Sequence, residues 1–179
     1  MSKKRIQELG EGLKSNDTNA VLKTIEEIRD DGSNELLRDL AKLLCSTKNK
    51  EIKESIYNLF CDLKNQSSVD KLITFITSNE LKKAKKTLLS ACWQTRLDFS
   101  DYLELFIDIV IKEPFELSFE AFTVVENNES KVTRDRKNEL IEYTKAKLSS
   151  IADQNLDLAH DIIPIIERYE EFEKKEKLV

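Results

Sequence analysis

The feature that most constrains the fold is the regular recurrence of helix-length apolar patterns. Apolar side chains at three- and four-residue spacing mark ten stretches, separated by short polar breaks. The odd-numbered stretches begin near residues 3, 33, 67, 99 and 131, and the even-numbered ones near residues 18, 50, 80, 115 and 155. The step of roughly 32 residues from one pair to the next predicts a repeat of two helices. Breaks this short make consecutive helices antiparallel neighbours.

Several breaks contain residues that start or stop helices. Gly32 follows the second stretch and is predicted to end it, because glycine reaches positive φ without strain. Ser33 and Asn49 are candidate N-caps for the third and fourth stretches. Ser67 with Asp70 three residues later has the spacing of a capping box.

The stretch at residues 80–96, ELKKAKKTLLSACWQTR, is the clearest amphipathic pattern and is predicted to be one helix. Its apolar stripe must pack against a neighbour and consists of Leu81, Ala84, Leu88, Ala91 and Thr95. The opposite side is basic and carries Lys82, Lys83, Lys85, Lys86, Trp93 and Arg96.

Three later segments depart from the regular helical pattern. Residues 115–125 are rich in aromatic and β-branched residues, and ELSFEAF alternates like a strand, but no partner strand is visible, so a helix is predicted. Asn155 begins the tenth stretch, and Pro164 within it predicts a kink or a split near residues 160–163. Residues 170–179 are predicted to be a frayed or disordered tail.

Composition supports an all-α fold. Three glycines and two prolines are too few for the hairpin turns of an all-β protein, and 35% charged residues is typical of exposed helices. The formal net charge of −5 argues against general nucleic-acid binding.

No metal site or cofactor is predicted. Cys45, Cys61 and Cys92 are far apart, and His160 is the only histidine, so the cysteines are expected to be reduced and buried. The first fifteen residues lack the apolar segment of a secretory signal, and no apolar run is long enough to span a bilayer. We therefore expect a cytoplasmic protein without a membrane partner.

The helix pairs resemble HEAT or HEAT-like (armadillo-type) repeats. The closest local match is TLLSACWQTRLDFSDYLELFIDIV at residues 87–110, which resembles the end of one repeat, a turn and the first helix of the next. The resemblance implies an α-α superhelix, or solenoid, of about five antiparallel helix pairs, forming a single domain over residues 1–179. A helical bundle without repeats is the alternative.

In solenoids of this class the second helices line the concave face, so the resemblance implies a ligand surface on the even-numbered helices. On the central helix that face would present Lys82, Lys86, Leu89, Trp93 and Arg96. On the next even-numbered helix it would present Glu116, Phe119, Glu120, Thr123 and Asn127. The predicted partner-binding residues are Lys82, Lys86, Trp93, Arg96, Glu116 and Glu120.

Each of these assignments has a structural alternative. Trp93 can pack between repeats instead of contacting a partner, and the lysines can form a solvated face. Residues 98–129 contain nine acidic residues and one base, Lys112. This acidic strip beside the basic helix could orient a partner, or the two strips could pair with each other within the chain.

The leading functional prediction is a non-enzymatic scaffold that binds a protein or peptide, itself a monomer or weak homodimer. No nucleotide-binding or hydrolase motif is present. The alternative is a nucleic-acid-binding HEAT-like protein, including a DNA-glycosylase-like enzyme that would use Lys86, Trp93, Arg96 and either Asp101 or Glu120. A third hypothesis is a dimerisation module that pairs through the eighth stretch.

Overall fold

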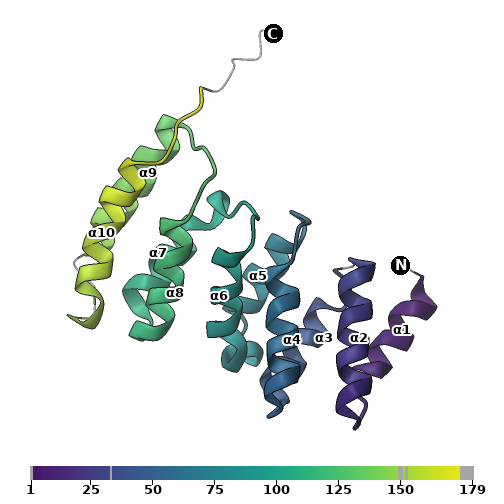
Figure 1. Ribbon diagram of the computed structural model, residues 1–179. Helices are drawn as coiled ribbons and strands as arrows, with labels where there is room; N and C mark the ends of the chain where they lie inside the picture. The colour runs from purple at the N-terminus through teal and green to yellow at the C-terminus, as the bar shows by residue number, and fades with distance from the viewer. Residues whose placement is uncertain (1, 33, 149–150, 152, 174–179) are drawn as a thin grey trace. The chain divides into compact units, whose positions relative to one another are not determined.

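The computed structural model describes residues 2–32, 34–148, 151 and 153–173. Across these residues the fold is all-α, as predicted, with ten α-helices and no strand (Figure 1). The chain divides into two compact units, Met1–Leu97 and Asp98–Val179, and each is described by itself.

The first unit consists of helix pairs. Its elements are α1 (Lys3–Gly12), α2 (Thr18–Asp31), α3 (Leu37–Ser46), α4 (Lys50–Cys61), α5 (Ser68–Thr77), the 3-10 helix η1 (Asn79–Ala84) and α6 (Lys85–Gln94). Helix α4 packs between α2 and α6, while α3 packs against α5 and η1. The even-numbered helices therefore form one row and α3 and α5 a second. Ile25, Ile56 and Leu89, one from each helix of the even row, are completely buried.

Side-chain hydrogen bonds join neighbouring even-numbered helices at close to the predicted repeat step. Asn49 at the start of α4 donates to Thr18 at the start of α2 over 3.2 Å, and the two residues are 31 positions apart. The hydroxyls of Tyr57 on α4 and Ser90 on α6 lie 3.3 Å apart and are separated by 33 positions. Both links connect corresponding turns of successive helices.

Three of the predicted helix boundaries are confirmed, but the capping box predicted at Ser67 is wrong. Gly32 ends α2 in the left-handed conformation with φ 61°, and the Asn49 side chain accepts from the first-turn amides of α4. Ser67 precedes α5 but makes no capping bond, because its hydroxyl accepts from Asn34 and donates to Asn65. Ser33 lies outside the described residues, and α3 begins only at Leu37.

The prediction of one continuous helix over residues 80–96 is wrong. Residues 79–84 form the 3-10 helix η1, Leu81 has non-helical angles of φ −102° and ψ 15°, and α6 spans only Lys85–Gln94. A 3-10 helix has three residues per turn, so Leu81 and Ala84 project on the same side, and both are completely buried. Packing of η1 against α3 and α5 accounts for this local change.

The second unit contains η2 (Ser100–Tyr102), α7 (Leu103–Lys112), α8 (Phe115–Glu126), α9 (Arg134–Lys147), η4 (Asp153–Asn155) and α10 (Leu156–Glu167). Helix α7 packs against α8 and α9, and α10 packs against α7, α8 and α9. Arg136 on α9 forms a forked ion pair with Glu104 on α7, 32 positions earlier. The carbonyl of Val125 on α8 accepts from the buried Tyr169 hydroxyl after α10.

The helical prediction for residues 115–125 is confirmed, since α8 covers them. Pro164 lies inside α10 without splitting it. Proline leaves the carbonyl four residues earlier without its helical donor. Pro164 and His160 are both exposed, so water can reach that carbonyl.

A short extended segment follows α10. Val132 forms an isolated parallel bridge with Glu171, and its amide and carbonyl bond Glu170 and Phe172 over 3.0 and 3.1 Å. An ion pair of 2.7 Å joins Lys131 to Glu170. The prediction of a frayed tail is wrong for residues 170–172, which these bonds hold in place, while residues 174–179 lie outside the described part of the chain.

Candidate interaction surfaces

Four of the predicted partner-binding residues belong to the first unit. Lys82 is exposed on η1, and Lys86 is exposed on the first turn of α6. Trp93 is half-buried on the last turn of α6, whereas Arg96 is exposed and lies beyond the end of that helix at Gln94. These residues therefore come from a 3-10 helix, an α-helix and a loop instead of one helical face.

The predicted inclusion of Leu89 in this face is wrong, because Leu89 is completely buried. Leu89 belongs to the inward-facing side of α6 together with Leu88, Ala91 and Cys92, which are also buried, whereas Lys86 on the same helix is exposed.

The second unit contains the other two predicted residues, Glu116 and Glu120, on α8. Glu116 is exposed and Glu120 is half-buried. Beside them are Phe115 and Phe119, which are 49% and 50% exposed and whose ring centroids lie 6.3 Å apart. Two large aromatic rings at this exposure form an apolar patch on a helix that the sequence predicts to face a ligand.

Several of these side chains already interact within the protein. Lys86, Trp93, Glu116 and Glu120 each take part in a polar, ring or electrostatic contact. A partner that used them would have to replace or extend those contacts. Phe115 and Phe119 need no such exchange, because their exposed ring surface is apolar.

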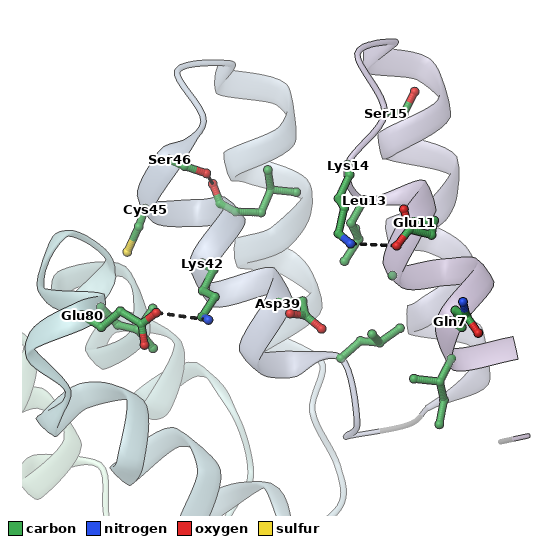
Figure 2. Close-up of a pocket in the computed structure, with 15 residues that line it drawn as sticks. Gln7, Glu11, Leu13, Lys14, Ser15, Asp39, Lys42, Cys45, Ser46 and Glu80 are labelled. Atoms are coloured by element: carbon green, nitrogen blue, oxygen red, sulfur yellow. Dashed lines mark hydrogen bonds and ion pairs between the residues drawn. The ribbon is translucent and has the colours of Figure 1, made fainter. Parts of the chain in front are cut away.

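A groove in the first unit was not predicted. It lies between α1 and α3, is closed by η1, and has a volume of about 840 Å³ (Figure 2). Of its fifteen lining residues, five are aliphatic: Ile6, Leu13, Leu36, Leu43 and Leu81. Five others are charged: Glu11, Lys14, Asp39, Lys42 and Glu80. Helix α1 packs chiefly against α2, which leaves this space beside α3.

Four of the five charges in the groove take part in ion pairs. Lys14 pairs with Glu11 over 2.7 Å on the α1 side, and this hydrogen bond raises the pKa of the lysine. On the other side Glu80 pairs with Lys42 over 3.1 Å and with Arg38 over 2.7 Å. Hydrogen bonds from Lys42 and then Arg38 lower the pKa of the Glu80 carboxyl.

Asp39 is the remaining charge. Figure 2 shows it projecting from α3 between the two ion pairs. It is exposed, and within the described part of the chain no ion pair includes it. The Asp39 charge helps to raise the pKa of Lys14, and Arg38 and Lys42 share the single charge of Glu80, so the charges in and beside the groove balance.

Sequence patterns could not reveal the groove, because its residues come from three separated elements. The one local sign is that Ile6 and Leu43 belong to apolar stripes but are only half-buried. Apolar residues in a helical stripe that stay partly exposed mark a place where the neighbouring helix does not close against them.

The described residues contain no group of three or more His, Cys, Asp or Glu side chains that could hold a metal ion. His160 is exposed on α10. Among the helices that the structure describes, none has the length and apolar character to cross a bilayer.

Comparisons with known proteins give no family. No protein-family model matches the chain, and no curated protein is significantly similar to it. One similar solved structure is the crystal structure of an engineered protein, at 15% identity and a TM-score of 0.42, with 93% of this chain and 81% of that chain covered. A likeness of this size carries no argument about fold or function.

Proposed function

We propose that the chain is a non-enzymatic, cytoplasmic scaffold that binds a protein or peptide on a face of HEAT-like helix pairs. In this proposal the pairs of both units belong to one solenoid, and the partner contacts its even-numbered helices. Lys82, Lys86, Trp93, Arg96, Glu116 and Glu120 remain the proposed partner-binding residues, with the protein itself a monomer or weak homodimer.

The spacing of the side-chain links supports the repeat interpretation. In the first unit they span 31 and 33 positions, and in the second Arg136 reaches Glu104 over 32 positions. In a row of stacked helix pairs, contacts between neighbouring pairs recur at one separation along the chain.

The observation that carries the functional proposal is the aromatic pair on α8. Phe115 and Phe119 stand one turn apart and keep about half of their surface exposed, at 49% and 50%. Covering an exposed aromatic ring supplies a large part of the free energy of many protein interfaces. Glu116 beside them adds a carboxylate that favours a basic partner.

Affinity capture with the full chain as bait tests this proposal. Wild-type protein should recover a specific partner, and Phe119→Asp should lose it while circular dichroism stays unchanged. Phe172→Asp is a matched control, because Phe172 is 46% exposed but follows α10. Capture that is absent, or equal for all three proteins, would refute the proposal.

A further inference from the structure

We propose that the basic segment at the start of α9 is a binding site for an extended acidic segment of a partner protein, and that the chain's own residues 170–172 occupy this site as a displaceable strap. The site consists of the Val132 backbone and the ammonium groups of Lys131 and Lys137. It goes beyond the proposed function, because it shares no residue with the partner-binding face proposed for the even-numbered helices.

The strap shows how an extended segment fits the site. It leaves α10 beside the start of α9 (Figure 1). The Val132 amide donates to the Glu170 carbonyl over 3.0 Å, and the Phe172 amide donates to the Val132 carbonyl over 3.1 Å. One parallel neighbour therefore uses both backbone groups of Val132. Because these bonds involve main-chain atoms alone, a segment of another protein can form them equally well.

Two ion pairs select acidic side chains at this site. Lys131 pairs with Glu170 over 2.7 Å, and Lys137 pairs with Glu171 over 2.8 Å. The hydrogen bond from Lys131 lowers the pKa of the Glu170 carboxyl, and the bond from Lys137 lowers that of Glu171. Successive side chains of an extended segment point to opposite faces, so each carboxylate meets its own cation.

The basic segment depends on the strap for its countercharges. Residues 131–137, KVTRDRK, contain four bases and one acid. Arg136 belongs to the ion pair with α7. In the described part of the chain, the ion pairs of Lys131 and Lys137 are made with the strap. The Lys137 side chain is only 13% exposed and would keep just the Glu167 carbonyl, 3.1 Å away, if the strap left. A carboxylate from a partner would restore the lost pair.

The strap can leave the site while α10 stays in place. The side chains of Glu170, Glu171 and Phe172 are all exposed, so the strap adds no side chain to the core. Tyr169, directly before it, is buried, and its hydroxyl donates to the Val125 carbonyl. This bond anchors the end of α10 independently of the residues that follow.

The covalent connection makes the strap an effective competitor. A segment tethered this closely has an effective concentration at its site on the order of mM. A free acidic segment at lower concentration therefore binds only to the fraction of molecules whose strap is open. The strap thus acts as an intramolecular inhibitor of the site.

A strap-release variant tests the site in the full chain. Glu170→Lys combined with Glu171→Lys places lysines against Lys131 and Lys137, so the strap should be expelled. The probe is a synthetic peptide that repeats the strap sequence, Gly-Glu-Glu-Phe-Glu-Gly, and its binding is followed by an NMR chemical-shift titration. We expect the release variant to bind it about tenfold or more tightly than wild-type protein does. A peptide with lysine in place of each glutamate should bind to neither protein.

Hydrogen exchange of the Val132 amide reports on the backbone bonds directly. In wild-type protein the Glu170 carbonyl protects this amide. In the release variant its exchange should be about tenfold or more faster, and the acidic peptide should restore the protection. A strap with a structural role alone would not be replaced by a separate peptide.

A charge swap provides the rescue experiment. Adding Lys131→Glu and Lys137→Glu to the release variant re-forms both ion pairs with reversed signs. Slow exchange of the Val132 amide should return without peptide, and the acidic peptide should no longer bind. As a control, Lys48→Glu with Lys53→Glu in the release variant changes as many charges at exposed positions of the first unit and should leave peptide binding unchanged.

Circular dichroism checks the fold of each variant. If the lysine substitutions lower the helix content, Glu170→Gln with Glu171→Gln removes the two charges at constant side-chain size and takes their place. Unchanged exchange of the Val132 amide on strap release, equal affinity of the released and wild-type proteins for the peptide, or peptide binding without protection of this amide would each overturn the site. None of these results bears on the proposed function, whose test depends on Phe119.

Discussion

Tyr143 on α9 donates a hydrogen bond of 2.8 Å to Asp108 on α7, which lies 35 positions earlier in the chain. Asp108 also pairs with Lys112 over 2.6 Å and with Lys147 over 3.3 Å. The Lys147 ammonium lies 4.9 Å from the centre of the Tyr143 ring. This cluster fixes α9 against α7 in the second unit.

The cluster makes stability depend on pH at both ends of the range. Burial raises the pKa of Asp108, but hydrogen bonds from Lys112, Tyr143 and Lys147 outweigh it, so the net pKa lies below the usual value. A carboxyl whose pKa is lowered by folding stabilises the fold above its unfolded pKa of about 4. This stabilisation is lost as the pH falls through the folded pKa.

Burial first, and then the bond to Asp108, raises the pKa of Tyr143 to about 12. That stabilisation is complete below about pH 10 and is lost as the pH rises through the folded value.

Tyr143→Phe is the first prediction. At neutral pH it should lower the free energy of unfolding by about 1.5–3 kcal/mol, because one hydrogen bond to a charged acceptor is removed. It should also reduce the loss of stability between about pH 10 and 12, because the raised tyrosine pKa is gone. Urea unfolding at several pH values measures both effects, and an unchanged alkaline limb would contradict the assignment.

The close approach of α1 to α2 gives the second prediction. A Cβ at Gly12 would lie 2.5 Å from Oγ1 and 2.9 Å from Cγ2 of Thr24, which is buried. Gly12→Ala should therefore destabilise the first unit by about 1–3 kcal/mol. Gly10→Ala is a matched control, since its Cβ would meet only Leu36 at 3.7 Å. It should be neutral or stabilise by up to about 1 kcal/mol, because alanine favours a helix more than glycine does. Equal effects in thermal unfolding would rule out the contact.

Asn49 combines a cap with a link between helices. Its Oδ1 accepts from the amides of Glu51 and Ile52 over 2.9 and 3.2 Å, and its Nδ2 donates to Thr18. Asn49→Ala should therefore cost about 1–2 kcal/mol. Asn58→Ala, at an exposed position inside α4, should change stability by less than about 0.5 kcal/mol. A cost below that of the control would show that Asn49 is not a cap in solution.

Asn155 is a completely buried polar side chain at the start of α10. Its amide donates to the carbonyl of Glu113 over 2.9 Å and to the Ser118 hydroxyl over 3.0 Å, so it joins α10 to the first turn of α8. Asn155→Ala should cost about 2 kcal/mol, because the Glu113 carbonyl and the buried Ser118 hydroxyl both lose a donor. Gln154→Ala removes an exposed amide and serves as the control. Chemical unfolding that does not separate the two variants would exclude the proposed link.

Local patterns were sufficient to predict the helices. Ile52, Ile56 and Leu59 follow the apolar spacing of α4 and are all buried. Gly32 is predictable as a helix stop because this role depends only on the ability of glycine itself to adopt positive φ. Residues 115–125 were assigned correctly despite their strand-like alternation, because a strand requires a partner and none was available.

Packing between distant parts of the chain determines the features that local sequence patterns did not predict. η1 forms where Leu81 is buried against α3 and α5, and the packing of α6 against α4 and α5 buries Leu89 instead of leaving it on the predicted ligand face. Asn155 was predicted only as a helix start, because its bond to Ser118 depends on α10 lying beside α8. The groove follows from the distance between α1 and α3, which no single stretch of sequence encodes.

Site-specific photocrosslinking tests directly whether the exposed aromatic face of α8 contacts a partner. Benzoylphenylalanine replaces Phe119 in one protein and Phe172 in another, and each is irradiated in extract from the chain's own cells. A partner-binding face on α8 should give a discrete crosslinked partner from position 119 that is absent from position 172. No crosslink at position 119, or the same products from both positions, would contradict a partner-binding face on α8.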